Sequence, residues 1–320
     1  MAKLSRPRRG SLQYWPRKRV KEILPSVNWT QIVLKNNDKK LLGFIGYKVG
    51  MLSAYVKDNT SESMTKNKRV VVPVTIIECP PVKIFSTRFY KNNNLVTEIL
   101  SSNLDKELKR VVKLPKNDVK KLEDVKHETY DDIQIIVYSI VKKTGLKKKP
   151  DMIEVGLGGN VHDKINFVKE NLNKEIKISD IFSPMQLVDV RGVTKGKGLE
   201  GAVRRHGIGL RSHKAEKGRR RAGSLGPWHP ARVTFRVPQA GQLGMFTRAT
   251  YNLKIIGLNS IEQNNINPSG GFKHFGNIHT DYLLLGGSVQ GPQKRALIIT
   301  FPLRKTKKQD KKNYEFIELR

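Results

Sequence analysis

The sequence predicts a β-rich protein in which a β-barrel is interrupted by an inserted α/β segment and carries long irregular basic extensions. Three observations predict this fold class. Short apolar runs rich in Val, Ile, Tyr and Phe recur between Gly and Pro residues, as strands do. One near-neutral stretch has helical spacing instead. Most of the excess positive charge lies in segments too rich in Arg, Lys and Gly to bury a core.

The composition requires a strongly anionic partner. The chain has 320 residues, with 61 Lys and Arg against 28 Asp and Glu, and its formal net charge is +33. A hydrophobic content of 38%, with 11 Phe, 9 Tyr and 3 Trp, can supply a packed core, which excludes a wholly disordered basic tail. The single cysteine, Cys79, excludes an internal disulfide and a cysteine-built zinc site. A reducing interior is therefore expected.

Neither the amino terminus nor the most apolar run of the sequence predicts a membrane segment. The amino terminus, MAKLSRPRRG, lacks the apolar stretch of a secretory signal. The most apolar run, residues 133–141 (IQIIVYSIV), is far shorter than the ~18 residues that a membrane helix needs. We expect it to be a buried strand, and we expect no membrane partner.

Charge and periodicity divide the chain into successive parts. Residues 3–21 hold eight basic residues and no acid, and Pro7, Gly10 and Pro16 prevent a regular element, so an irregular arm is expected. Residues 91–180 hold 15 of the 28 acids against 18 basic residues. The predicted parts are an arm at 1–40, the first barrel strands at 41–90, an inserted α/β segment at 91–180, the remaining barrel at 181–303 with a basic finger at 191–236, and a basic tail at 304–320.

Two patterns of apolar spacing define the elements inside these parts. Barrel strands are predicted at residues 42–56, 70–78, 82–90, 187–194, 253–258, 283–289 and 296–301. Helical spacing is seen in three groups within the insertion, which are Leu95, Ile99, Leu104, Leu108 and Val111, then Val119, Leu122 and Val125, then Ile165, Val168 and Leu172.

The finger, residues 191–236, has a composition typical of an RNA-binding segment. Nine Arg and four Lys stand against two Glu, a net +11 over 46 residues that include nine Gly. Such a loop repels itself unless phosphates neutralise it. Arginine predominates, which suits bidentate phosphate bonding and stacking on bases. Laid out and back, the finger could reach about 70 Å into a folded RNA. The alternative is a solvated flexible loop.

Trp228 is the unusual residue of the finger. It lies in a Gly-Pro-Trp-His-Pro turn, where a large aromatic could stack on a base or fold back onto the protein body as an anchor. Trp15 likewise lies between basic clusters. His206, His213 and His229 lie among arginines, where they could contact phosphate or a base edge, or remain solvated.

Two apparent enzyme motifs fail their structural requirements. Residues 196–201 (GKGLEG) match the dinucleotide fingerprint GxGxxG, but the helix of ten or more residues that must follow is interrupted by Gly207 and Gly209. His279, Asp281 and Ser288 could suggest a catalytic triad, yet no nucleophile elbow is present. No catalytic residue, cofactor, metal or small-molecule substrate is therefore predicted.

Several motifs together closely resemble those of a universal family, the third protein of the large ribosomal subunit in its archaeal and eukaryotic form. They are RPRRGSL (6–12), GFIGYKVGM (43–51), DVRGVTKGKGLEG (189–201), GPWHPARV (226–233), AGQLG (240–244) and PSGG (268–271). The resemblance implies a six-stranded barrel of the translation-protein type with an inserted α/β segment. It also implies a structural role in the cytoplasmic ribosome, early subunit assembly, and a finger tip at Trp228 and His229 near the peptidyl transferase centre.

The expected partners are large-subunit ribosomal RNA and neighbouring large-subunit proteins. The residues expected to contact RNA are Arg6, Arg8, Arg9, Trp15, Arg17, Lys18, Arg19, Arg191, Lys195, Lys197, Arg204, Arg205, His206, Arg211, His213, Lys214, Arg219, Arg220, Arg221, Trp228, His229 and Arg232. Two other functions share the basic character of the chain. They are an RNA-modifying enzyme, which would need a cofactor loop, and a DNA-architectural protein, which would not need a 46-residue finger.

Overall fold

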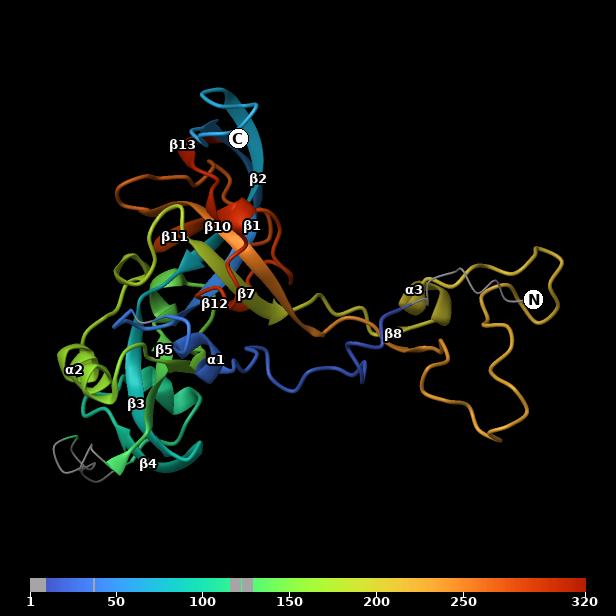
Figure 1. Cartoon of the computed structure of the whole chain (residues 1–320), viewed down its shortest axis with the longest axis horizontal. Helices are drawn as coiled ribbons and strands as arrows, with labels where there is room; N and C mark the ends of the chain where they lie inside the picture. The colour runs from blue at the N-terminus through green and yellow to red at the C-terminus, as the bar shows by residue number, and fades with distance from the viewer. Residues whose placement is uncertain (1–9, 37, 116–121, 123–128) are drawn as a thin grey trace. The chain divides into compact units, whose positions relative to one another are not determined.

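The structure is a computed structural model of the whole chain, and it describes residues 10–36, 38–115, 122 and 129–320. The chain, coloured by residue number in Figure 1, divides into two compact units. The larger unit contains residues 23–192 and 248–320. The smaller unit contains residues 1–22 and 193–247. The arm predicted for residues 1–40 is thus divided between the two.

Six strands of the larger unit form a closed ring. Their order is β12-β7-β10-β11-β2-β1, and β1 pairs again with β12. The strands are β1 (Gly43–Asp58), β2 (Arg69–Cys79), β7 (Leu187–Val193), β10 (Thr247–Ser260), β11 (Asp281–Gly286) and β12 (Ala296–Thr300). All six coincide with runs for which the sequence predicted strands. The prediction of a β-rich fold is confirmed, and the sheet is ring-like.

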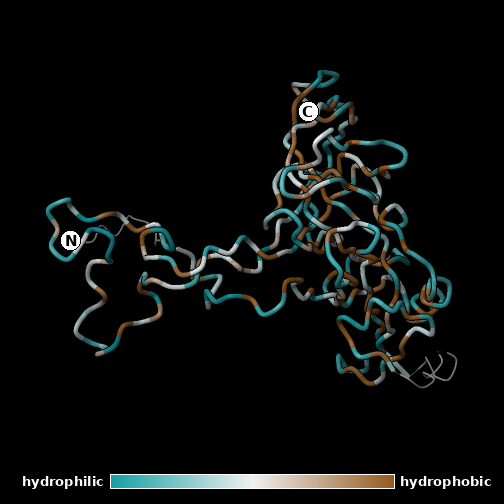
Figure 2. The backbone as a smooth tube through the Cα atoms, turned by 180° about the vertical axis from the view of Figure 1, so that it is seen from behind, coloured by the Kyte–Doolittle hydropathy of each residue, from teal (hydrophilic) through white to brown (hydrophobic). Residues whose placement is uncertain are grey.

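The ring forms because its strands bury their apolar residues together. In β12 all five residues are buried, and in β11 four consecutive residues are buried. The antiparallel register places Ile45 opposite Ile298 and Leu283 opposite Ile77, so large aliphatic side chains meet in the core. Figure 2 shows hydrophobic residues recurring along the strands of this unit. Burial of this surface is the main stabilising contribution.

A seventh strand lies where the sequence predicted only a basic tail. β13 (Tyr314–Leu319) pairs with the far half of β1, and a short helix, α4 (Lys307–Asp310), precedes it. Lys254, which is almost fully buried, donates to the carbonyl oxygens of Gln309 and Asp310 at 3.2 and 2.9 Å. The end of the chain is therefore attached to the ring.

The insertion is built on a second sheet of four strands. Its order is β4-β3-β5-β6, with β3 (Val82–Lys91), β4 (Asn94–Leu100), β5 (Asp132–Ser139) and β6 (Met152–Gly156). The sequence predicted residues 82–90 as a strand, correctly, but placed it in the barrel, which is wrong. Residues 133–141 were predicted as a buried strand, and β5 confirms this.

Helical spacing in the insertion predicted one helix correctly and another wrongly. Residues 161–171 form helix α2 (Val161–Asn171), as the third group predicted. Leu95 and Ile99, however, lie in strand β4, so the helix predicted there is wrong. Their spacing of four residues also fits the two-residue period of a strand, which explains the error. Leu108 lies in a 3₁₀ helix, η1 (Lys106–Arg110), whereas Val119 and Val125 lie outside the described residues.

Two further 3₁₀ helices lie in connections: η4 (Val141–Thr144) follows β5 and precedes β6, and η5 (Ile178–Asp180) precedes ring strand β7. Helix α1 (Trp29–Val33) anchors the chain ahead of β1. The Trp29 ring is 4% exposed, and its Nε1 donates to the Glu154 carbonyl oxygen at 2.9 Å. Gly43 and Gly156 leave room for it, since an added Cβ would lie 2.6 and 2.9 Å from Trp29 atoms.

The smaller unit has little regular structure. It contains a two-stranded sheet, β8 (Leu199–Glu200) with β9 (Gly241–Gln242), and a short helix, α3 (Ala202–His206). Residues 10–22 contain no helix or strand, as predicted for the arm. Of its described residues, only Val193 and Ala202 are buried apolar side chains. Hydrophobic burial therefore cannot be what orders this unit.

Candidate nucleic-acid interface

The smaller unit concentrates the positive charge of the chain. Its 77 residues carry 20 Lys and Arg against three acids, Glu22, Glu200 and Glu216. The other 243 residues carry 41 Lys and Arg against 25 acids. Net charges are thus +17 and +16, so the smaller unit has about three times the charge density.

Acidic side chains neutralise few of these cations. Among the described residues, the smaller unit has one ion pair, in which Arg204 lies 2.6 Å from Glu200. Ten further ion pairs lie in the larger unit. The charge of the smaller unit is therefore largely available to an external anion.

A backbone ladder forms the base of the finger. The Thr194 N–H donates to Phe246 O at 3.0 Å, and the Lys197 N–H donates to Leu243 O at 2.9 Å. Gly244 has φ +76°, and a Cβ there would lie 1.9 Å from the Lys195 carbonyl oxygen. Only glycine fits this close approach, which fixes where the two sides of the finger meet.

Helix α3 is held against this base by Arg205. Its guanidinium donates to four backbone carbonyl oxygens, those of Gln242 at 3.0 Å, Gln239 at 3.1 Å, Arg17 at 3.3 Å and Ala240 at 3.5 Å. Burial lowers the pKa of Arg205, because its guanidinium is partly removed from water. Because its guanidinium hydrogen-bonds backbone oxygens, Arg205 has a structural role.

Arg17 of the arm makes the reciprocal contact. It donates to Arg205 O at 3.0 Å and to Ser11 O at 3.1 Å, and it lies 3.3 Å from Nδ1 of the buried His206. The Val20 N–H donates to Met245 O at 3.0 Å. We call the contacts of Arg17 and Arg205 the arginine clasp. It joins the arm to the finger base within the smaller unit.

An aromatic contact adds to the clasp. The rings of Trp15 and Phe235 lie 5.1 Å apart between centroids, and the Arg236 guanidinium carbon lies 5.9 Å from the Phe235 centroid. Sequence reasoning singled out Trp15 but missed Phe235. The signal was present, because Phe235 is an aromatic residue among arginines, as Trp228 is.

Residues 207–240 extend from this base without a helix or strand. Trp228 is 88% exposed. Other predicted RNA contacts in this stretch are also exposed, namely His213, Lys214, Arg219, Arg220, Arg221, His229 and Arg232. Arg211 is half-buried, and its backbone N–H donates to Arg219 O at 3.1 Å.

The remaining predicted contacts are distributed unevenly. Lys18, Arg19, Lys195, Lys197 and Arg204 are exposed in the smaller unit. Arg191 lies in β7 of the ring, where it donates to the Thr300 hydroxyl and where burial lowers its pKa. Arg6, Arg8 and Arg9 lie outside the described residues. The structure thus brings Arg17, Arg205 and His206 together within the smaller unit, whereas Arg191 belongs to the larger unit.

The apparent enzyme motifs do not form catalytic geometry in the described part of the chain. The fingerprint GKGLEG is followed by α3, which has five residues, far fewer than a dinucleotide-binding helix. His279 and Asp281 line one pocket that does not include Ser288. Among the described residues, no group of three or more His, Cys, Asp or Glu side chains could hold a metal.

Comparison with known proteins identifies the family of the chain. The family model for ribosomal protein L3 matches residues 1–320. The chain belongs to the ribosomal protein L3 family. Among its relatives are three archaeal proteins named large ribosomal subunit protein uL3. The protein of Methanobrevibacter smithii is 40% identical over 325 residues, covering 97% of this chain and 95% of the relative.

The other two relatives agree closely with the first. The protein of Methanocaldococcus jannaschii is 40% identical, covering 94% of this chain and 92% of the relative. That of Archaeoglobus fulgidus is also 40% identical, covering 95% and 94%. The resemblance inferred from the motifs is confirmed. No helix in the described part of this family member is long and apolar enough to span a bilayer.

Proposed function

We propose that the chain is a structural constituent of an archaeal large ribosomal subunit in the cytoplasm, with no catalytic activity of its own. It binds large-subunit ribosomal RNA and supports early assembly of the subunit. Its finger approaches the peptidyl transferase centre with Trp228 and His229 at the tip, and neighbouring subunit proteins are further partners. The closed ring of six strands is, in this proposal, the barrel of the translation-protein type, and the second sheet belongs to its insertion.

The observation that carries the proposal is that the described residues of the smaller unit form one ion pair, Arg204 with Glu200, although the unit holds 20 Lys and Arg, in a chain matched to the family over its whole length. An exposed arginine cluster without acids and without a core is unstable in isolation through self-repulsion. Folded RNA supplies phosphates and 2′-hydroxyls along its surface, which such a cluster can contact by charge and shape.

Individual residues take different parts in this proposal. The exposed cations, among them Lys214, Arg219, Arg220 and Arg221, contact phosphates. Trp228 stacks on an unpaired base, worth about 1–3 kcal/mol. Arg17 and Arg205 donate to backbone oxygens, so they shape the surface that the other cations present.

The test measures binding of the full chain to large-subunit RNA at several salt concentrations. Replacing Arg219, Arg220 and Arg221 by Gln removes up to three phosphate contacts, so the slope of log K against log salt should fall by about 2. The matched control replaces Lys57, Lys66 and Lys68 of the larger unit by Gln. These lysines are also exposed, and the slope of log K against log salt should fall less in this variant. Equal slopes in the two variants would contradict the proposal.

The same assay separates the rival functions. A structural ribosomal protein should prefer large-subunit RNA over duplex DNA increasingly as salt rises, because non-specific charge contacts are screened. Equal loss of affinity for both nucleic acids would favour a DNA-architectural protein. Calorimetric binding of S-adenosylmethionine or a nucleotide would favour an RNA-modifying enzyme.

A further inference from the structure

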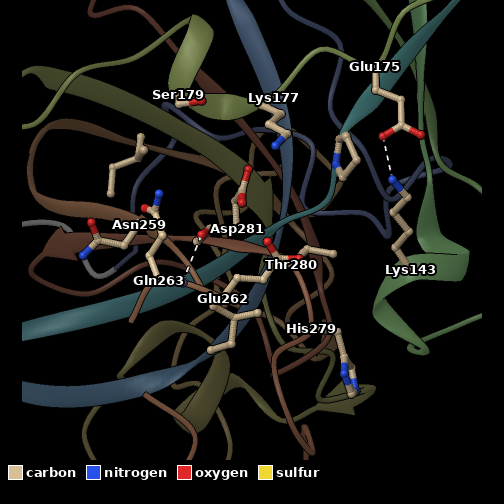
Figure 3. A pocket seen from close by; sticks show the side chains of 14 residues that line it. Lys143, Glu175, Lys177, Ser179, Asn259, Glu262, Gln263, His279, Thr280 and Asp281 are labelled. Carbon is tan, nitrogen blue, oxygen red and sulfur yellow. Dashed lines mark hydrogen bonds and ion pairs between the residues drawn. The ribbon is translucent and has the colours of Figure 1, made fainter. Parts of the chain in front are cut away.

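A polar pocket in the larger unit has no part in the RNA surface proposed above. It has a volume of about 650 Å³ and lies where the end of β10 and the start of β11 face the insertion. Its polar lining includes Asn259, Ser260, Gln263, His279, Thr280 and Asp281 from the ring side, and Lys143, Glu175, Lys177 and Ser179 from the insertion side. Figure 3 shows Asp281 near the centre of these side chains. This volume is within the range of sites that bind peptides or small molecules.

The charges in the pocket are not balanced internally. Lys143 is already neutralised by Glu175, at 2.6 Å (Figure 3). Asp281 and Glu262 make no ion pair within 4.0 Å among the described residues, and neither does Lys177. Two carboxylates thus face one ammonium group. In a chain of net charge +33, this is a local excess of negative charge.

The environment of Asp281 leaves its negative charge undercompensated. Burial raises the pKa of this carboxyl; Lys177 lowers it, Glu262 and Asp180 raise it, and Lys143 makes a smaller lowering contribution. The Asp281 side chain makes no hydrogen bond to the described residues. An added cation would stabilise its ionised form.

The wall that carries Asp281 is held in place from behind. Glu78 on β2 is fully buried, and its Oε1 accepts from the His279 N–H at 2.9 Å, the Thr280 N–H at 3.2 Å and the Thr280 hydroxyl at 3.2 Å. Ser260 and Asp281 are themselves register partners of β10 and β11. The pocket is therefore formed before a ligand arrives, which lowers the entropic cost of binding.

From these observations we propose that the pocket binds an arginine or lysine side chain of a partner polypeptide, with Asp281 as the main acceptor and Glu262 as the second. A phosphate group would meet two unneutralised carboxylates, so the nucleic acid that fits the smaller unit does not fit here. A bare metal ion is disfavoured as well, because no group of three ligating side chains is present among the described residues. The polar groups of Asn259 and Gln263 can complete the hydrogen bonds of a guanidinium.

The test uses N-acetyl-arginine amide as the probe, with the full chain observed by amide nuclear magnetic resonance. The neutral isostere N-acetyl-citrulline amide is the matched ligand control. We expect saturable shifts at the amides of Ser260, Thr280 and Asp281 with the arginine probe, and at least tenfold weaker binding of the citrulline probe. Shifts of equal size with both probes, or saturable shifts of the same amides with inorganic phosphate, would overturn the proposal.

Three variants locate the binding energy, and Glu170→Gln serves as a control because this exposed acid lies outside the pocket. Asp281→Asn should weaken the arginine probe at least tenfold, and Glu262→Gln about threefold. Lys177→Gln removes the competing ammonium, so it should strengthen binding about threefold, an effect that loss of structure cannot produce. If Lys177→Gln weakens binding, or if Glu170→Gln weakens it as much as Asp281→Asn, the assignment is wrong. RNA affinity should be unchanged in Asp281→Asn, which keeps this test separate from that of the RNA-binding function.

Discussion

The two units of the chain have almost the same net charge, +17 and +16, on 77 and 243 residues. The larger unit contains every cluster of the hydrophobic core, with residues such as Phe44, Ile76 and Leu283 fully buried. The smaller unit has two buried apolar residues among those described, Val193 and Ala202. The larger unit is therefore stabilised by burial, whereas the smaller unit is ordered mainly by hydrogen bonds and, in the function proposed above, by phosphates that neutralise its charge.

The two units also differ in how their cations are paired. In the larger unit, cations are matched by acids at ten ion pairs among the described residues. In the smaller unit, arginines that lack acids donate to carbonyl oxygens or remain exposed. Substitutions in the two units should therefore differ in what they change, stability in one case and ligand binding in the other.

The largest effect on stability is expected from Trp29→Ala in the larger unit. The ring of Trp29 is 4% exposed, fills the space left by Gly43 and Gly156, and its Nε1 donates to the Glu154 carbonyl. Its loss creates a cavity and an unsatisfied carbonyl oxygen, so the free energy of unfolding should fall by about 3–5 kcal/mol. Urea denaturation followed by far-ultraviolet circular dichroism measures this. Leu225→Ala, in the exposed finger, is the control and should change it by less than about 0.5 kcal/mol.

The next largest effect is a pH dependence that originates in Glu78. Burial raises the pKa of Glu78 from 4.5 to about 7. Between these values the unfolded carboxyl loses its proton while the folded one retains it, so stability should fall as pH rises from about 4.5 to 7. The loss can reach about 3 kcal/mol at 1.36 kcal/mol per pKa unit. It should be complete just above pH 7.

Glu78→Gln separates this effect from other titrations. The amide oxygen can still accept the hydrogen bonds from His279 and Thr280, but the side chain no longer ionises. Denaturation curves at pH 5 and pH 8 should therefore differ less in the variant than in the unmodified chain. The Glu170→Gln control should retain the full difference. If Glu78→Gln shows the same decline as the unmodified chain, another group is responsible.

Much of the ring was predictable because its strands are locally marked. Runs such as residues 296–301 are apolar, short and bounded by other residue types, and each became a strand. The sheet that a given strand joins was less predictable. Residues 82–90 have the same apolar pattern as the ring strands, but they pair with β5, which lies about 50 residues further along the chain. β13 was missed because the charge of residues 304–312 dominated the interpretation, although Tyr314, Phe316 and Leu319 are apolar.

The candidate interface was predictable in composition and unpredictable in detail. An excess of arginine without acids is visible in the sequence, and the exposed cations of residues 213–232 match it. Arg17 and Arg205 could not be distinguished from them, because their acceptors include backbone carbonyls 188 positions away along the chain or on the opposite side of the finger. Side-chain chemistry alone does not show which backbone oxygens a fold leaves unpaired.

A smaller effect is expected when the arginine clasp is broken. Arg17→Gln removes hydrogen bonds to Arg205 O and Ser11 O, worth about 0.5–1.5 kcal/mol each. The arm should open more often, so hydrogen exchange at the Val20 amide should accelerate about tenfold while the ring amides are unaffected. Arg17→Lys should not restore protection, because an ammonium lacks the fork that reaches both oxygens. The exposed Arg19→Gln is the control, and equal acceleration there would show that charge rather than the clasp holds the arm.

The smallest effect on stability is expected from Trp228→Ala, which makes it the sharpest contrast to Trp29→Ala. Trp228 is 88% exposed, so its removal leaves no cavity and should change the free energy of unfolding by less than about 0.5 kcal/mol. Its effect should appear in the ribosome instead, as altered tRNA accommodation or antibiotic response with subunit assembly largely intact. Ribosomes carrying Trp228→Ala can be compared with those carrying Leu225→Ala, whose exposed side chain also lies in the finger. Unchanged translation kinetics and unchanged RNA reactivity at the peptidyl transferase centre would contradict the role proposed for Trp228. A loss of stability would show instead that the Trp228 side chain packs against other parts of the protein.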